Sequence, residues 1–416
     1  MNYHDPSNLA IIACPGGEAF ADKVISHLEA YYQQNYIETV EILAKKYSLD
    51  RREVIQRFNF MRDTSTICAV IPEGIAEAPD FHFKTSVQYT LFANGEIKAE
   101  ILESIRGKDI YIFQDMENHS PIAFHNGVKK SLTVNDNLMT ALVTVDVAIQ
   151  AGAGRVTLIW PIYPYSRQHK KKGREGLTAA RIAFTMETLG VSRIITLDIH
   201  SEEIMNAFSA MRLENCYASY DIIPALAKIA NINDPNLVVV SPDTGAVIRN
   251  RFYANYLSKS LAMLYKKRDY SKTSKDANET NIEEMQLLGD VEGMTVFMAD
   301  DMLDTGGTLL KAMKFLKEKK AGKVICAISL PLFTGSDTDS LKAIKNFDEA
   351  YRDGLFYRII GTNAIFHQQE LLDREWYIEV DISDLFAQII SRLHESQSLS
   401  SLLDNREDIN RLRKNE

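Results

Sequence analysis

Short apolar runs rich in β-branched residues alternate with amphipathic stretches along most of this chain. The clearest apolar runs span residues 9–13, 109–113, 155–160, 193–197, 237–240, 295–299 and 324–329. Helical periodicity appears between them, for example at residues 18–32, 137–150, 178–189 and 308–319. Strands that alternate with helices form parallel sheets, and continuous apolar strands are typical of sheets covered on both faces. The sequence therefore predicts an α/β fold with mostly parallel sheets flanked by helices.

Bulk properties narrow the class of protein. A chain of 416 residues is long enough for two or three domains, each with its own core. A net charge of −9 argues against a general nucleic-acid-binding protein. The four cysteines are far apart, which argues against zinc or a redox dithiol and fits a reducing compartment. With no secretory signal and no long apolar run, we expect a cytoplasmic protein that binds neither membrane nor nucleic acid.

Four loops that follow predicted strands are unusually polar. They span residues 165–174, 198–203, 241–249 and 300–308. In parallel sheets, ligands bind beyond the carboxyl ends of the strands. These loops therefore mark the expected active site.

The loop at residues 300–308 (DDMLDTGGT) carries the most specific chemistry in the chain. Its carboxylates can accept hydrogen bonds from sugar hydroxyls, and its threonines and glycine amides can bind an anion where the next helix begins. We expect it to hold both ends of a phosphorylated pentose through Asp300, Asp301, Asp304, Thr305, Gly306, Gly307 and Thr308. A helix cap with a glycine turn explains one or two of these residues, but not all of them in order. The loop resembles the phosphoribosyl-diphosphate loop of phosphoribosyltransferase-fold proteins.

Further motifs occur in the order found in ribose-phosphate pyrophosphokinases. The chain resembles that family at residues 92–97 (FANGEI), 103–112 (ESIRGKDIYI), 135–139 (NDNLM), 164–171 (PYSRQHKK), 198–208 (DIHSEEIMNAF), 241–245 (SPDTG), 265–268 (YKKR) and 393–403 (LHESQSLSSLL). The number and order of these matches make the resemblance specific.

The resemblance implies two tandem phosphoribosyltransferase-like domains. The first spans residues 6–213, with insertions near 33–83 and 115–133. The second spans 214–390 and carries the ribose-5-phosphate loop, and residues 391–416 form a last helix and a charged tail. The implied reaction transfers the pyrophosphoryl group of ATP to the 1-hydroxyl of ribose 5-phosphate, with Mg²⁺ as cofactor, giving 5-phosphoribosyl 1-diphosphate and AMP.

The family also implies roles for individual residues. Lys266 and Arg268 are the expected catalytic cations, at the start of a polar segment (residues 269–284) that would close over the substrates. His200 and Asp243 are the expected Mg²⁺ ligands, with Asp198 orienting His200 or a metal-bound water. The expected ATP-binding residues are Arg167 and Gln168, together with Phe92, Asn94 and Glu96 around the adenine.

Each assignment has a plainer alternative from sequence alone. Phe92 can belong to the core beside an Asn94-Gly95 hairpin turn. Residues 266–268 can form a solvated helix end, and we expect Lys267 to face solvent in any case. His200 can be structural, since Mg²⁺ prefers oxygen ligands. The basic run at residues 167–174 can be an exposed turn or a nucleic-acid site.

The chain differs from the family in two regions, and these differences limit what the resemblance implies about assembly and regulation. The segment before Phe92 is longer than usual by several tens of residues, and residues 115–133 are also extended. We expect a homo-oligomer, either a hexamer or another dimer-based assembly, but its size and its allosteric control stay open. The alternative function is a catalytically silent, synthetase-associated regulatory subunit. Such a subunit is expected to lack Lys266, Arg268 or the acidic loop, and this chain keeps all three.

Overall fold

The computed structural model describes residues 6–57, 81–171, 173–268, 282–335, 341–400 and 402. The chain divides into two compact units. The first contains Met1–Thr196, Ser201–Asn215 and Ser383–Leu402, and the second contains Leu197–His200, Cys216–Ile382 and Leu403–Glu416. The domain limits expected from the family, at residues 213 and 390, stay predictions.

A five-stranded sheet lies at the centre of the first unit. Its order is β1 (Leu9–Ala13), β4 (Asp109–Phe113), β7 (Arg155–Ile159), β8 (Arg193–Leu197) and β9 (Arg212–Cys216). The first three neighbouring pairs are parallel. Every residue of β4 is buried, as expected for a central strand of a sheet covered on both faces.

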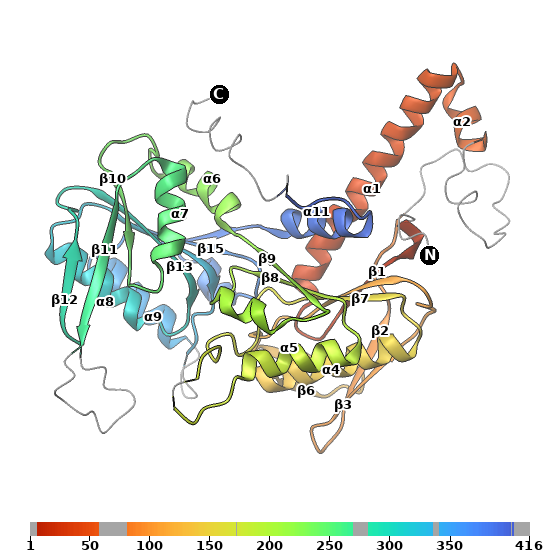
Figure 1. The fold of residues 1–416 in the computed structure, drawn as a ribbon, viewed down its shortest axis with the longest axis horizontal. Helices are drawn as coiled ribbons and strands as arrows, with labels where there is room; N and C mark the ends of the chain where they lie inside the picture. The colour runs from red at the N-terminus through yellow and green to blue at the C-terminus, as the bar shows by residue number, and fades with distance from the viewer. Residues whose placement is uncertain are drawn as a thin grey trace. The chain divides into compact units, whose positions relative to one another are not determined.

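Four long helices belong to this unit (Figure 1): α1 (Glu18–Tyr47), α4 (Val134–Gln150), α5 (Thr178–Leu189) and α11 (Ser383–His394). α4 begins at a capping box, in which the side chains of Thr133 and Asp136 each accept a bond from the other's backbone amide. α1 packs on α11, and the rings of Phe20 and Phe386 meet edge to face with centroids 5.2 Å apart. The last helix that the structure describes therefore belongs to the first unit.

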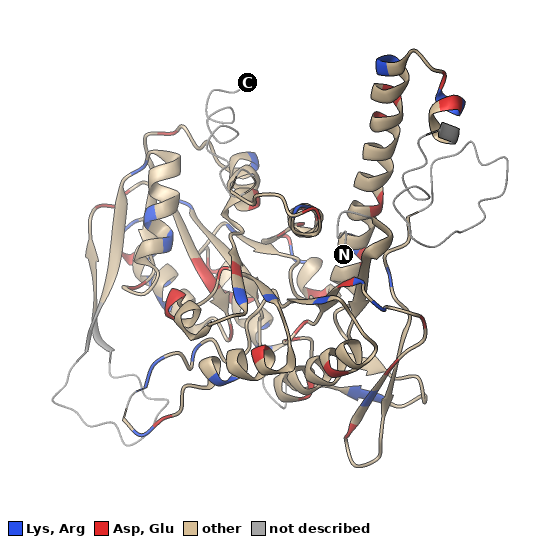
Figure 2. Ribbon diagram, turned by 45° about the vertical axis from the view of Figure 1, so that its right-hand side comes forward, with Lys and Arg blue, Asp and Glu red and all other residues tan. Residues whose placement is uncertain are grey.

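α1 is longer than its predicted range of residues 18–32. No glycine or proline interrupts it, and it ends at Ser48 in the left-handed conformation. The short helix α2 (Arg51–Arg57) packs against it, and Val40 and Val54 are buried. Charged residues of both signs are spread along α1 (Figure 2). The rest of the first expected insertion, from residue 58 to residue 80, lies outside the described residues.

Two antiparallel hairpins complete the first unit. One joins β2 (Val87–Leu91) to β3 (Ile97–Ile101). The other joins β5 (Pro121–Ala123) to β6 (Lys129–Ser131), and it lies within the second expected insertion. Single 3-10 turns occur at η1 (Pro6–Asn8) and η2 (Glu202–Ala207).

The second unit is built on a seven-stranded sheet. Its order is β12 (Ile282–Leu288), β11 (Leu261–Arg268), β10 (Leu237–Ser241), β13 (Thr295–Leu303), β14 (Val324–Pro331), β15 (Arg358–Thr362) and β16 (Tyr377–Val380). Only the β11/β12 pair is antiparallel. Along β14 all side chains are buried, so the sheet is covered on both faces.

Helices cover the two faces of this sheet. α8 (Gly307–Glu318) and α9 (Lys342–Arg352) share a core with Val296 and Met298 of β13. Phe297 points to the opposite face, because side chains alternate along a strand. There its ring centroid lies 5.1 Å from that of Tyr253 on α7 (Val247–Leu257). The remaining helices of this unit are α6 (Ser219–Ile229) and α10 (Gln369–Leu372).

The predicted α/β fold is confirmed, with one difference at the polar segment 269–284. Residues 282–284 belong to β12 rather than to a loop, while 269–281 and the charged tail 404–416 lie outside the described residues. Among the described residues, no helix is long and apolar enough to cross a membrane.

Candidate active site

The acidic loop joins the centre of the second sheet to a helix start. β13 continues beyond the predicted end at residue 299, because Asp300 and Met302 still pair with Ile328 and Leu330 of β14. α8 then begins at Gly307, and Thr305, Gly307 and Thr308 are exposed. The amides and hydroxyls at this helix start are therefore open to an anion.

Gly306 caps α8 in a conformation that favours glycine. Its φ is 75°, and a Cβ at this position would lie 2.2 Å from the ring of Phe347. Phe347 is fully buried, so it has little freedom to move away. Residue 306 must therefore be glycine for the loop to keep this shape.

His200 and Asp301 are in direct contact. Nδ1 of His200 lies 2.8 Å from Oδ2 of Asp301, and the imidazole is about one-third exposed while the carboxylate is mostly buried. The contact fixes the direction of the imidazole ring and leaves Nε2 on its far side. A histidine after β8 and a carboxylate at the end of β13 are thus brought together within the second unit.

Asp198 does not orient His200, which was one of the two roles expected for it, while a role toward a metal-bound water stays a prediction. Its Oδ1 lies 2.7 Å from Nη1 of Arg249, and its Oδ2 accepts hydrogen bonds from the Ser329 hydroxyl at 2.5 Å and the Ala218 amide at 3.0 Å. Asp301 orients His200 instead. Asp198 also has a φ of 44°, a conformation that aspartate tolerates better than most residues and that is concentrated at functional sites.

Asp300 and Asp301 have opposite pKa shifts. Burial alone would raise the pKa of Asp301, but the hydrogen bond with His200 and the charge of Arg249 lower it to about 2. Burial and the neighbouring Asp301 charge raise the pKa of Asp300 well above its usual value. The pair therefore retains a proton at pH values where isolated carboxyls would both be ionised.

Asp243 lies close enough to join this cluster electrostatically. Its charge contributes to the raised pKa of Asp300. Its Oδ1 accepts hydrogen bonds from the amides of Gly245 and Ala246 at 2.9 and 3.0 Å, which holds the carboxylate at the end of β10. Within the described parts of the chain, no three His, Cys, Asp or Glu side chains are grouped as a metal site. His200 and Asp243 offer one imidazole nitrogen and one carboxylate, so a hard cation at this place would need most of its ligands from substrate and water.

Lys266 and Arg268 occupy the far end of β11. Lys266 pairs with Met285 of β12, and a bulge follows between Lys267 and Arg268. This strand position excludes the alternative of a solvated helix end. The side chains of residues 266–268 lie outside what the structure describes. Because β10 and β11 are parallel, Asp243, which follows β10, and Lys266, in the second half of β11, lie toward the same edge of the sheet.

The remaining predicted site residues belong to the first unit. Phe92 is 48% exposed beyond the end of β2, which excludes the alternative that it belongs to the core. Asn94 does form a turn here, because its Oδ1 accepts a bond from the Glu96 amide at 3.1 Å. Arg167 and Gln168 are exposed, and Oε1 of Gln168 accepts a hydrogen bond from the Thr178 hydroxyl at 2.7 Å.

The sequence assigned no role to Arg249, Ser329 or Asn250. Arg249 and Ser329 fix Asp198, while the Asn250 side chain bonds both the amide and the carbonyl of Ala299, at 2.9 and 2.8 Å. Asn250 thereby ties α7 to β13 immediately before the acidic loop. For these three residues, the only hint in the sequence of a role at the site is that Arg249 ends the polar loop 241–249.

Comparisons with known proteins agree with this geometry. Residues 66–190 match the N-terminal domain of ribose phosphate pyrophosphokinase, and residues 210–356 match the phosphoribosyl transferase domain. A ribose-phosphate pyrophosphokinase from a Marinomonas species is 34% identical over 314 residues, which is 75% of this chain and 88% of the relative. The corresponding protein of Burkholderia pseudomallei is 33% identical over 313 residues, covering 75% of this chain and 87% of its own.

A solved structure resembles the chain over nearly all of its length. The crystal structure of phosphoribosylpyrophosphate synthetase from Mycobacterium smegmatis matches with a TM-score of 0.66 and 25% identity, covering 94% of this chain and 99% of that chain. The expected pair of phosphoribosyltransferase-type domains is thereby confirmed. The chain belongs to the ribose-phosphate pyrophosphokinase family.

Proposed function

We propose that this chain transfers the pyrophosphoryl group of ATP to the 1-hydroxyl of ribose 5-phosphate. The 1-hydroxyl oxygen forms a bond to the β-phosphorus, the bond between the α,β-bridging oxygen and that phosphorus breaks, and AMP leaves. The hydroxyl proton is released, and the products are AMP and 5-phosphoribosyl 1-diphosphate. The observation that carries the proposal is the exposed start of α8 after the strand that brings Asp301 to His200, in a member of this family.

The second unit would hold the sugar phosphate. The exposed hydroxyls and amides of Thr305, Gly307 and Thr308 would bind the 5-phosphate, with Gly306 giving the loop its shape and Asp304 beside it. Asp300 and Asp301 would accept hydrogen bonds from the ribose hydroxyls. Positioning and charge neutralisation supply most of the catalysis in phosphoryl transfer, and Lys266 and Arg268 would supply the positive charge.

The nucleotide would be bound by residues of the first unit. The exposed ring of Phe92 can stack on adenine, and Asn94 and Glu96 can bond its edge. Arg167 and Gln168 would bind the triphosphate. These roles come from the family resemblance, and the exposure of Phe92, Arg167 and Gln168 supports them.

A metal cofactor agrees with the kinase-type chemistry of this family, and we propose that it is Mg²⁺. His200 and Asp243 would hold it, directly or through water. When bound, Mg²⁺ neutralises charge on the phosphate oxygens. The protein's own contribution is to fix the two side chains, through Asp301 for the imidazole and through the Gly245 and Ala246 amides for the carboxylate.

We also expect a homo-oligomer, a hexamer or another dimer-based assembly, that works in the cytoplasm. The alternative of a silent regulatory subunit is disfavoured because Lys266, Arg268 and the whole acidic loop are present in the sequence. A phosphoribosyltransferase that consumes the product is disfavoured by the length of the match, which extends over two domains.

A direct assay tests the reaction. The protein is mixed with ATP, ribose 5-phosphate and Mg²⁺ in phosphate buffer, and AMP is followed over time. We expect AMP only when ribose 5-phosphate is present, in equal amount to 5-phosphoribosyl 1-diphosphate. Failure to form ribose-dependent AMP would exclude the proposal and favour the silent subunit. AMP without ribose 5-phosphate would indicate simple hydrolysis.

A further inference from the structure

One helix, α7, holds all three segments that carry charged residues of the candidate site. The backbone amides at its start fix Asp243 at the end of β10. Two adjacent side chains of the same helix, Arg249 and Asn250, extend to the other two segments, which carry His200 and Asp301. All of these residues belong to the second unit. The sequence assigned neither Arg249 nor Asn250 a role.

Arg249 joins α7 to the turn that follows β8. Its side chain is only 19% exposed, and its Nη1 lies 2.7 Å from Oδ1 of Asp198, two residues before His200. The backbone of Asp198 has a φ of 44°, a conformation that persists where the surrounding structure holds it. The ion pair with Arg249 supplies such a hold. Arg249 thereby fixes the backbone that carries His200, while Asp301 orients the imidazole ring.

Asn250 takes the place of a neighbouring strand at the end of β13. β10 pairs with β13 no further than Phe297. The next backbone groups of β13 on that side are the N–H and C=O of Ala299, because these groups alternate between the two sides of a strand. The fully buried side chain of Asn250 accepts a hydrogen bond from this amide at 2.9 Å and donates one to this carbonyl at 2.8 Å. Asn250 thus fixes the backbone immediately before Asp300 and Asp301.

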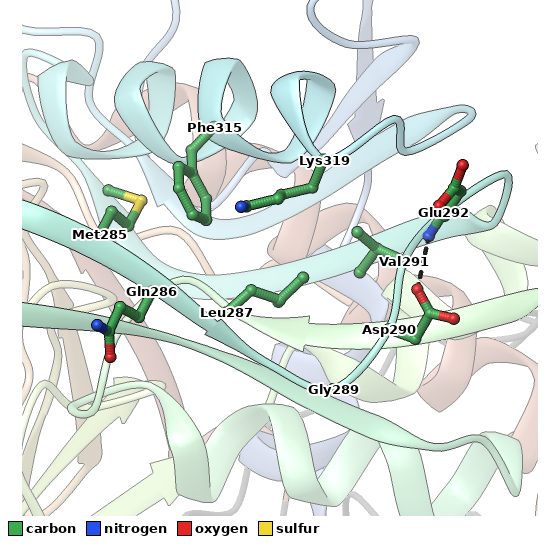
Figure 3. A pocket seen from close by; sticks show the side chains of 9 residues that line it. All are labelled: Met285, Gln286, Leu287, Gly289, Asp290, Val291, Glu292, Phe315 and Lys319. Atoms are coloured by element: carbon green, nitrogen blue, oxygen red, sulfur yellow. Dashed lines mark hydrogen bonds between the residues drawn. The ribbon is translucent and has the colours of Figure 1, made fainter.

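Packing holds α7 itself on the sheet. The helix lies against β10 and β13 (Figure 1), and its Tyr253 and Leu257 are buried. The ring of Tyr253 meets that of Phe297 edge to face, with centroids 5.1 Å apart. The hollow between β12 and the last turns of α8 (Figure 3) lies apart from this arrangement, because no residue of α7 or of the three segments lines it. Truncation of Arg249 or Asn250 should therefore release the segment that each one holds and leave α7 in place.

We propose that Arg249 and Asn250 are positioning residues that together fix the His200–Asp301 pair for the proposed reaction. Arg249 acts through the turn that leads to the imidazole, and Asn250 acts through the end of β13 that leads to the carboxylate. Loss of Arg249 disturbs a proposed metal ligand, whereas loss of Asn250 disturbs the carboxylates that would bind the ribose hydroxyls. These consequences for the reaction rest on the proposed function.

Steady-state AMP formation by the full chain gives a different signature for each residue. At saturating ATP, Arg249→Ala should raise the free Mg²⁺ concentration for half-maximal rate about ten-fold or more, the scale for partners that orient metal ligands. Asn250→Ala should instead raise the KM for ribose 5-phosphate about ten-fold, because small displacements of groups that position a substrate have large effects. A protein that is merely unstable would lose kcat and keep both constants, since its folded fraction would still bind normally.

The same helix supplies matched controls. Arg251→Ala and Asn255→Ala remove side chains of the same types from exposed positions of α7. Both variants should keep the Mg²⁺ and ribose 5-phosphate constants of the unsubstituted chain. Should an alanine variant at residue 249 or 250 fail to fold, Arg249→Lys or Asn250→Asp replaces it with the same expectations, because each nearly keeps the size of the side chain and removes donor groups.

Crystal structures of the same variants test the positioning without turnover. The 2.8 Å contact between Nδ1 of His200 and Oδ2 of Asp301 should lengthen beyond hydrogen-bonding distance in the variants of Arg249 and of Asn250. An unchanged contact in both variants, or unchanged Mg²⁺ and ribose 5-phosphate constants, would overturn the proposed positioning role. A lack of AMP formation in the unsubstituted chain would contradict only the proposed function, and the crystal structures would then decide on the positioning alone.

Discussion

Gly306 is the residue at which the site tolerates a side chain least. Replacing it with alanine forces a left-handed conformation on a residue with a Cβ and pushes that Cβ into the ring of Phe347. The conformational cost is about 1–2 kcal/mol, and overpacking of a core adds about 1–3 kcal/mol. We expect Gly306→Ala to lower the temperature of thermal unfolding and to raise the KM for ribose 5-phosphate.

Gly307→Ala is the matched control for that variant. Its added Cβ would meet nothing within 4 Å, and the residue lies at the first position of α8. Alanine is a better helix former than glycine, so we expect no loss of stability. Equal unfolding temperatures for Gly306→Ala and Gly307→Ala would show that the loop does not have the shape described here.

Lys266 is the residue on which we expect catalysis to depend most. Lys266→Ala removes a positive charge that would act on the phosphates in the transition state, so turnover should fall by about 10³-fold or more. The KM for ribose 5-phosphate should change little. Steady-state AMP formation measures both. Lys267→Ala is the control, because we expect Lys267 to face solvent rather than the substrates. A similar loss in both variants would mean that only the net charge of the strand matters.

At the scale of elements, a buried ionic cluster attaches α11 to the first sheet. Asp109 at the start of β4 accepts a hydrogen bond from Nε of Arg155 at 2.7 Å and lies 2.9 Å from Nδ1 of His394 on α11. Arg155 also donates to the carbonyl of Leu393 at 3.2 Å. The side chains of Asp109 and His394 are fully buried. α11 is thus bound to residues far away in the sequence.

Removing the charge of Asp109 should therefore loosen α11. Burial would raise the pKa of Asp109, but the hydrogen bonds from Arg155 and His394 outweigh it and lower the pKa. A lowered pKa stabilises the fold above the unfolded pKa of about 3.9, and that contribution is lost as pH falls through the folded value. Asp109→Asn should cost about 3 kcal/mol at pH 7, the scale of a broken buried pair. The difference from the unsubstituted chain should shrink below about pH 4.

Urea unfolding at pH 7 and at about pH 3 measures this difference. Glu292→Gln is the control, because it removes a carboxylate from an exposed pair with Lys320, and exposed pairs contribute little. Similar urea midpoints for Asp109→Asn and the control at pH 7 would mean that packing alone holds α11 in place.

Most buried elements could be predicted from the sequence because their apolar pattern is local. β1, β4, β8 and α5 have the bounds that the sequence predicts. The polar end of β13 was missed because Asp300 and Met302 are held in the strand by pairing with β14, which local composition does not reveal. β12 was missed for a similar reason, since it is a polar edge strand whose pairing partner β11 precedes it.

The site was predictable only as a set of loops. The residue types of His200 and the acidic loop could be predicted from motifs, although the two follow strands of different sheets. Which side chain pairs with which carboxylate could not be predicted from the sequence. Asp198 and Asp301 are both carboxylates within reach of the cluster, and only the side-chain geometry assigns Arg249 to one and His200 to the other.

At the scale of the whole molecule, each unit has its own sheet and its own part of the proposed chemistry. The described residues of the second unit contain the proposed sugar-phosphate loop and both proposed metal ligands. The described residues of the first unit contain the proposed nucleotide-binding positions. Turnover would need both sets, so the ligands should stabilise the protein most when they are bound together.

Metal removal tests how the cofactor enters this arrangement. Mg²⁺ requires about six oxygen ligands, and the described residues provide no group of three candidate ligands. We therefore expect EDTA to abolish turnover but to change the unfolding temperature by no more than about 1 °C, since little folding energy depends on a metal held by two side chains.

Mg²⁺ with ATP should raise the unfolding temperature by several degrees, because a ligand at about 100 times its Kd contributes about 2.7 kcal/mol. Mg²⁺ alone should add little. Thermal unfolding followed with EDTA, Mg²⁺, ATP, and Mg²⁺ plus ATP separates these cases, and a marked drop with EDTA would instead reveal a resident structural metal.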